Sequence, residues 1–309
     1  MFSGVVSLTL DAEQLVFFER EGYLVVPNAF DPVGLQPAIT EITSVIHERA
    51  LEAVARGDLS QTYVDEPFET RLWKIHQEYE DLYWSLLGRT LEARGIFPLI
   101  TNSALLDLAE AIVGPEIIAS AVYVLRPKLP GHWHGEVPWH QDSAYFGLDP
   151  HELVTVWLAL TDATTDMGCM KVIPGSHRGE TYSHEETFHE KNLLARGQVI
   201  HGIDDTNAAY MPLKRGQFSC HHERILHASD PNDTPNDRIG LGLFFIPTHV
   251  KSTIGRRTAC LVRGVDDYGY WDEDPAPKGR FDSDIIAHIR QASERYVDPQ
   301  YVQEAEEKA

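Results

Sequence analysis

The chain has 309 residues, and its 47 acidic and 26 basic side chains give a formal net charge of −21. A protein surface this negative repels phosphates and anionic lipid, which excludes a general nucleic-acid or membrane-surface binder. Hydrophobic residues make up 43% of the chain, so it is not disordered as a whole, and it carries neither an apolar run of about 18 residues nor a recognisable signal peptide. Three cysteines are a sparse, odd set, which is typical of reduced thiols and predicts a cytoplasmic protein.

The first 115 residues predict mainly helices. Asp11 or Thr9 can cap a short helix that Gly22 ends, and residues 23–27 predict a strand. Further helices are expected at 34–55 and 102–112, with a loop at 56–70 between them. We expect residues 71–91 to be mixed, with helix in the second half.

From residue 116 the pattern changes to short strands separated by turn residues. Helices followed by strands can form two domains, but no linker separates the halves, so we predict one domain over residues 1–309. Residues 1–115 form its mainly helical flank, 116–250 hold most of the β-core, and 251–309 form a C-terminal extension. We expect residues 180–212 to leave the core as a lid insertion, and residues 265–280 to be a second excursion. The strands are expected at 117–125, 153–160, 169–173, 216–222 and 239–246.

The segment Trp139-His-Gln-Asp142 carries the first chemical signal. On a strand, residues i and i+2 point to the same face, so His140 and Asp142 would lie side by side. They would be two ligands of a 2-His-1-carboxylate triad, which leaves positions open on Fe(II).

A third ligand has to come from a distant part of the chain, and His227 is the best candidate. Arg238 follows it by 11 residues and opens a run in which Arg238, Gly240 and Gly242 share one strand face. An arginine beside two positions without side chains suits a pocket for a small carboxylate. The same glycines would also suit a strand that packs closely against another backbone.

Other histidines compete with this assignment. His221 and His222 form a pair near His227, but neither has an arginine 11 residues later. His132 and His134 share the i, i+2 spacing, although their flanking glycines indicate a loop over the mouth of the pocket. His177 and His184 are expected to be structural and solvated, respectively.

The ordered set of motifs resembles the phytanoyl-CoA dioxygenase family of Fe(II)/2-oxoglutarate oxygenases over most of the chain. The matching residues are Phe17-Phe-Glu-Arg-Glu-Gly-Tyr-Leu-Val-Val-Pro27, Trp139-His-Gln-Asp142, Trp157, Gly168-Cys-Met-Lys-Val-Ile-Pro-Gly-Ser-His177, and His227 with Arg238.

This resemblance implies a mainly β fold with flanking helices and a double-stranded β-helix (jelly-roll, cupin-like) core. It implies that Fe(II) is bound by His140, Asp142 and His227, and that 2-oxoglutarate and O₂ are co-substrates. Arg238, helped by Ser229, would pair with the distal carboxylate of 2-oxoglutarate. The resemblance places four more residues at the co-substrate: Gln141, Trp157, Tyr123 and Lys74.

The expected reaction is hydroxylation, or a related oxidation, of a C–H bond with release of succinate and CO₂. Halogenases of this family have a small residue in place of the metal carboxylate, whereas this chain keeps Asp142. Two other functions stay open on the same β-barrel. One is a zinc-type hydrolase or isomerase, and the other is a non-catalytic ligand-binding jelly-roll.

The substrate is expected to be a small, partly polar molecule derived from secondary metabolism or from an amino acid, because no basic cluster is present to hold the phosphates of an acyl-CoA. No nucleic-acid or membrane partner is expected, and the sequence does not predict an oligomeric state. We expect loops at 132–137 and 180–212, and part of residues 56–84, to cover the cavity. Their candidate apolar walls are Phe68, Trp73, Tyr145, Phe146, Phe188 and Met211.

Overall fold

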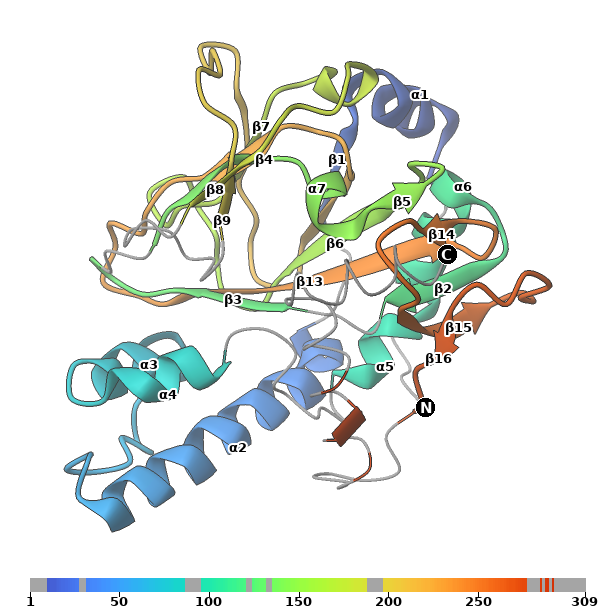
Figure 1. Ribbon diagram of the computed structural model, residues 1–309. Coiled ribbons are helices and arrows are strands. Elements are labelled where there is room, and N and C mark those ends of the chain that lie inside the picture. Colours follow the sequence, from blue (N-terminus) through green and yellow to red (C-terminus); the bar gives the residue numbers. More distant parts are fainter. Residues whose placement is uncertain are drawn as a thin grey trace.

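Two sheets face each other, both antiparallel except for one parallel pair at the edge of the larger sheet, and helices cover the outer side of this larger sheet (Figure 1). The computed structural model describes residues 10–27, 32–86, 96–120, 124–131, 135–187 and 197–276, with four further residues between 284 and 291. In the large sheet the strand order is β1-β11-β6-β13-β2-β15-β16, with β3 also paired to β13. The small sheet has the order β10-β7-β12-β4. The predicted jelly-roll core is therefore confirmed.

The strands of each sheet come from remote parts of the chain. The large sheet contains β1 (Tyr23–Val26), β2 (Ile117–Ser120), β3 (Val124–Lys128), β6 (Val154–Ala159), β11 (Phe218–His222), β13 (Arg238–Pro247), β15 (Thr258–Arg263) and β16 (Asp272–Glu273). The small sheet contains β4 (Val137–His140), β7 (Met170–Val172), β10 (Ala209–Met211) and β12 (His227–Ser229). Two small pairs, β5 (Leu148–Asp149) with β14 (Lys251–Ser252) and β8 (Glu185–Thr187) with β9 (Gly197–Val199), lie outside them.

Two of the described helices, α1 and α6, begin at residues whose side chains cap them. Asp11 caps α1 through a capping box with Gln14, and Gly22 ends this helix in the left-handed conformation. Asn102 caps α6 through its side chain. The helices are α1 (Ala12–Glu21), α2 (Pro32–Arg56), α3 (Phe68–His76), α4 (Glu80–Leu86), α5 (Phe97–Ile100), α6 (Ser103–Val113) and α7 (Ser143–Phe146), with a 3₁₀ turn at Ser176–Arg178. No helix in the described part of the chain is long and apolar enough to cross a membrane.

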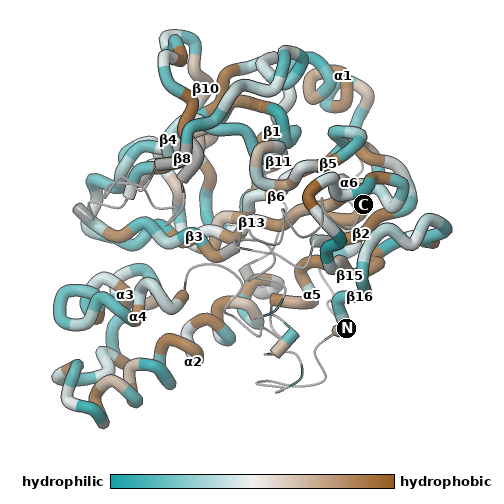
Figure 2. The backbone as a smooth tube through the Cα atoms, viewed as in Figure 1, coloured by the Kyte–Doolittle hydropathy of each residue, from teal (hydrophilic) through white to brown (hydrophobic). Residues whose placement is uncertain are grey.

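The main core lies between the large sheet and the helices. Strand β13 is buried along its whole length, and Leu241 and Phe245 pack in one cluster with Ile42 of α2 and Leu72 of α3. Figure 2 shows hydrophobic residues along β13 and along α2 and α5 beneath it. Because successive strand residues alternate between faces, the other face of β13, which carries Arg238, is turned toward the small sheet.

Four expectations about elements need correction. Residues 71–91 are helical from their start, because α3 already begins at Phe68 and buries Arg71, Leu72 and Ile75. The strand expected over 117–125 is two strands, β2 and β3, which both pair with β13. The end of the expected lid, residues 209–211, is β10 of the small sheet. Residues 271–273 pack onto the fold, because Trp271 is buried and its indole N–H donates to the carbonyl of Val250.

Candidate metal centre and its cavity

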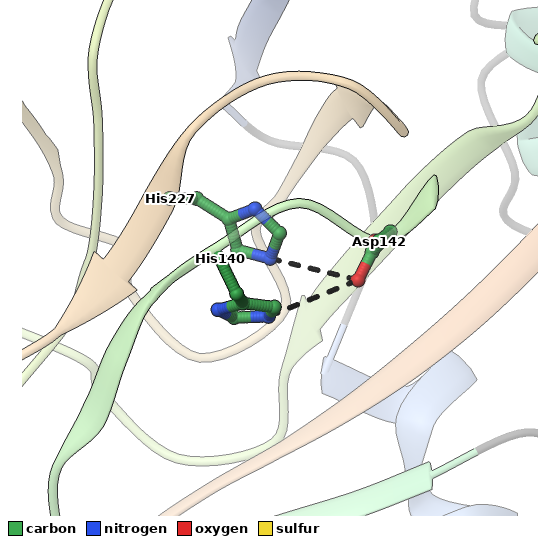
Figure 3. A group of neighbouring side chains, drawn as sticks. All are labelled: His140, Asp142 and His227. Atoms are coloured by element: carbon green, nitrogen blue, oxygen red, sulfur yellow. Dashed lines mark ion pairs between the residues drawn. The ribbon is translucent and has the colours of Figure 1, made fainter. Parts of the chain in front are cut away.

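Two histidines and one aspartate converge between the sheets. His140 is the last residue of β4, and it lies opposite His227, the first residue of β12. Asp142 Oδ1 is 3.9 Å from His140 Nε2 and 3.6 Å from His227 Nε2, and Figure 3 shows the three side chains pointing toward one another. The structure thus brings together the three residues that the sequence selected.

The reason for the proximity of His140 and Asp142 differs from our expectation. Strand β4 ends at His140, and Asp142 has helical angles of φ −60° and ψ −30° just before α7. The side chains therefore meet because the chain turns inward after the strand, and not because they share a strand face.

Backbone carbonyls fix the orientation of both imidazoles. His140 Nδ1 lies 2.8 Å from the carbonyl of Pro138, and His227 Nδ1 lies 3.1 Å from the carbonyl of Ile225. A carbonyl only accepts, so each Nδ1 carries the proton and each Nε2 keeps its lone pair. Burial lowers the pKa of both imidazoles, which favours the neutral form that binds metals.

The two carboxylate oxygens of Asp142 have different neighbours. Its Oδ2 accepts from Thr155 Oγ1 at 2.7 Å and lies 3.2 Å from His221 Nε2. Burial acts to raise the pKa of Asp142, but His227 and His221 outweigh it and hold the pKa well below its usual range. The carboxylate is therefore ionised, and Oδ1 remains directed at the two imidazoles.

These side chains line a cavity between the sheets. Among the described residues of its lining, Asp142 alone does not belong to a strand. The lining residues are Arg126, Val137, His140, Asp142, Thr155, Trp157, Met170, His221, His227, Ala228, Ser229, Arg238, Gly242 and Phe244.

Arg238 supplies a buried positive charge to this cavity. Its Nη1 and Nη2 donate to the backbone carbonyls of Arg126 and Gly168 at 3.2 and 3.0 Å. Its Nε has no partner, and none of the described carboxylates forms an ion pair with it. Burial lowers its pKa to about 10, so the guanidinium is charged at neutral pH and suits an anionic ligand.

Trp157 and the glycines of β13 shape the wall beside Arg238. The guanidinium carbon of Arg238 lies 5.0 Å from the centre of the Trp157 ring, which is the range of a cation–π contact. A Cβ on Gly240 would lie 1.9 Å from this ring, so a larger residue at this position would displace the indole. The close neighbour of Gly240 is thus a side chain and not a second backbone, and Gly242 lines the cavity.

The other expected co-substrate residues differ in position. Ser229 and Trp157 line the cavity, whereas Gln141 is fully buried and does not. The Gln141 amide instead joins two backbone groups, donating to the carbonyl of Arg224 at 2.6 Å and accepting from the N–H of Tyr182 at 2.9 Å. Lys74 is exposed on α3 and is not among the lining residues. Tyr123 lies outside the described residues, as do His132, His134 and Phe188.

The described apolar walls come from strands. Val137, Met170 and Phe244 line the cavity, while the expected wall residues Phe146 and Met211 are buried in separate core clusters. Phe68, Trp73 and Tyr145 pack against the core and do not line the cavity either. These five apolar side chains therefore contribute to the stability of the fold and not to the described wall of the cavity.

Sequence reasoning missed two polar side chains of the cavity, Thr155 and Arg126, did not find the role of His221, and misplaced His184. Thr155 shares the cavity face of β6 with Trp157, and this alternation was the signal that could have found it. His221 was considered only as a rival metal ligand, and Arg126 was not considered. His184 is half-buried rather than solvated, because its Nε2 accepts from the backbone N–H of Gln141 at 3.0 Å.

A double-stranded β-helix with two histidines and a carboxylate in the cavity between its sheets is typical of mononuclear non-haem iron enzymes. The sequence pattern of the phytanoyl-CoA dioxygenase (PhyH) family matches residues 18–240. The chain therefore belongs to this family, whose members are Fe(II)/2-oxoglutarate oxygenases.

Individual relatives are similar at modest identity. The human peroxisomal phytanoyl-CoA dioxygenase is 25% identical over 245 residues, which cover 76% of this chain and 68% of the relative. The apo structure of ThoJ, a non-heme monooxygenase, is 24% identical and superposes with a TM-score of 0.71 over 96% of this chain and 100% of that one. CytC3 with Fe(II) and alpha-ketoglutarate is 19% identical, with a TM-score of 0.54 over 89% and 97% of the two chains.

The residues of this chain fit the cofactor and co-substrate of the family. Two neutral imidazoles and one carboxylate oxygen are the donor set that suits Fe(II) with open positions. The unpaired Nε of the buried Arg238 matches the carboxylate chemistry of 2-oxoglutarate. Fe(II) and 2-oxoglutarate are thus the expected cofactor and co-substrate on both family and chemical grounds.

Proposed function

We propose that the protein is an Fe(II)/2-oxoglutarate-dependent hydroxylase that acts on a C–H bond of a small organic molecule, with His140, Asp142 and His227 as the metal ligands. One observation carries the proposal, namely that these three donor groups lie within 4.8 Å of one another in the cavity. The carbonyl contacts of the two Nδ1 atoms support it, because they leave a lone pair on each Nε2 for a metal ion.

Arg238 is proposed to bind the distal carboxylate of 2-oxoglutarate, with Ser229 as an additional donor. The buried guanidinium with its unpaired Nε supports this role, as does Ser229 in the same cavity lining. Trp157 would hold the guanidinium plane in place through its ring contact. When bound, the iron centre would activate O₂ while 2-oxoglutarate is decarboxylated to succinate.

Hydroxylation is favoured over halogenation because Asp142 occupies the position of the carboxylate ligand, with Oδ1 directed to both histidines. A halide would need the position that this oxygen takes. The protein contributes orientation, since the product depends on which C–H bond the cavity presents.

The substrate is proposed to be partly polar, and derived from secondary metabolism or from an amino acid. The cavity combines apolar side chains, Val137, Met170 and Phe244, with the cation of Arg126. A panel of partly polar compounds from secondary metabolism or derived from amino acids should include one that triggers succinate release. A response to acyl-CoA alone would contradict this substrate class.

A cytosolic site of action is also proposed, because the cysteines are free thiols, two of them buried.

The test of the cofactor assignment is an anaerobic titration of the apo-protein with Fe(II) and then 2-oxoglutarate. A chelated 2-oxo acid on Fe(II) gives a visible charge-transfer band, which we expect for the parent protein and not for His227→Ala. A flat spectrum with metal bound in the parent would contradict the proposal and would favour the zinc-type reading.

A further inference from the structure

The second oxygen of Asp142 is held by a pair of side chains from the opposite sheet. His221 and Thr155 are direct cross-strand neighbours on β11 and β6 of the large sheet, and both line the cavity. Asp142 reaches them from the end of β4 in the small sheet. Its carboxylate therefore bridges the two sheets.

One carboxylate oxygen of Asp142 contacts the large sheet, and the other faces the imidazoles of His140 and His227. Oδ2 accepts from Thr155 Oγ1 at 2.7 Å and lies 3.2 Å from His221 Nε2, while Oδ1 is the oxygen nearest to both imidazole Nε2 atoms. A carboxylate can bind a metal through one oxygen or through both. Binding through both would take a position that the co-substrate or O₂ requires.

We propose that His221 is a positioning residue which, together with Thr155, holds Asp142 as a one-oxygen ligand. This inference rests on the proposed function, because it presumes that Asp142 binds the metal. Hydrogen bonds to a ligating carboxylate fix its orientation and its basicity. The side chain of His221 is 1% exposed, so bulk solvent does not compete for its contact with Asp142.

His221 does not itself belong to the ligand set. Its Nε2 is directed at Asp142 Oδ2, and its ring centre lies 4.7 Å from that of His227. The group of donor atoms that converge within 4.8 Å contains His140, Asp142 and His227 and leaves His221 out. Loss of His221 should therefore weaken the metal site, whereas loss of His227 should abolish it.

The experiment measures Co(II) binding to the apo-protein by calorimetry and by visible absorption, without turnover. We expect His221→Phe, which keeps a ring but removes the donor, to bind Co(II) about 10- to 100-fold more weakly and to show an altered Co(II) spectrum. His221→Gln, whose amide N–H can reach the place of Nε2, should restore affinity to within about threefold. Ser219→Ala is the matched control, because Ser219 lies two residues earlier on the same face of β11 and does not line the cavity.

Each outcome decides between the two proposals. If His221→Phe binds Co(II) as the parent does, with the same spectrum, His221 is not a positioning residue although the triad stands. If the parent does not bind Co(II), or if His227→Ala binds it unchanged, the proposed function fails and this inference fails with it. Should His221→Phe not fold by circular dichroism, His221→Gln is compared with His221→Met, and equal affinities of these two would overturn the inference.

Discussion

Replacement of Arg238 by methionine should uncouple 2-oxoglutarate binding from the stability of the fold. The guanidinium is 3% exposed and its partners are two backbone carbonyls. A buried charge without a counter-charge is costly, and an apolar residue of similar size in its place is often neutral or stabilising. Removal of the buried charge favours the folded state, whereas the carbonyls of Arg126 and Gly168 lose their donors, which costs about 1–3 kcal/mol each. Because the two effects oppose each other, we expect the free energy of unfolding of the unliganded variant to lie within about 1.5 kcal/mol of that of the parent.

The effect on 2-oxoglutarate should be much larger. Removing one partner of a buried charge pair costs about 2–5 kcal/mol, which corresponds to an affinity loss of about 30-fold to a few thousand-fold. A ligand at 100 times its dissociation constant stabilises the native state by about 2.7 kcal/mol. At the same concentration a variant with 100-fold weaker binding gains only about 0.4 kcal/mol.

The assay is thermal unfolding of the metal-loaded protein at increasing 2-oxoglutarate concentration. The parent should show a midpoint that rises with ligand, and Arg238→Met should show almost none of this rise. Arg238→Lys is the control that keeps the charge but loses the two-pronged geometry, so its response should be intermediate. Equal midpoint shifts in Arg238→Met and the parent would refute the assignment.

Three further substitutions test the surroundings of the site. Gly240→Ala places a Cβ 1.9 Å from Trp157, so we expect a loss of about 1–3 kcal/mol in unfolding free energy and weaker 2-oxoglutarate binding by calorimetry; unchanged affinity would contradict the role of the ring. Gln141→Leu leaves two backbone partners unpaired, and chemical denaturation should show a loss of about 1–3 kcal/mol for each. Burial raises the pKa of Asp237 to about 8, so its contribution to stability is full below about pH 4 and is lost as the pH rises through about 8. Urea midpoints across this range should fall less for Asp237→Asn than for the parent, and parallel curves would contradict that shift.

The sequence predicted the ligand set because its signal is local and ordered. A histidine and a carboxylate two residues apart, followed by His227 and Arg238 at a separation of 11 residues, need no knowledge of packing. The helix caps Asp11 and Asn102 were predictable for the same reason, since each cap binds N–H groups within three residues of itself.

The start of α3 was not predictable, because a distant residue completes it. Asp237 accepts from the N–H of Trp73 at 3.2 Å, and the N–H of Asp237 donates to the carbonyl of Glu69 at 2.6 Å. Both bonds tie α3 to a residue that lies 164 positions after Trp73 in the sequence. No local sequence pattern in residues 68–76 indicates that Asp237 is a partner of this helix.

The contacts of Gln141 were not predictable for a related reason. The family resemblance places this residue at the co-substrate, whereas its side chain ties the β4 segment to the chain at Arg224 and Tyr182. His184 adds a contact to the backbone of the same residue. The residue supports the ligands by fixing their backbone, and that function depends on contacts more than 40 residues away.

The site lies between two sheets, and strands of both sheets supply its side chains. His140 and His227 belong to the small sheet, while Arg238 and the partners of Asp142 belong to the large one. None of the described lining residues comes from a helix, so the helices contribute by packing on the far face of β13. Because strands hold side chains more precisely than loops do, selection among substrates of similar size should depend on cavity residues of the strands, such as Arg126 and Phe244, at least as much as on the covering loops.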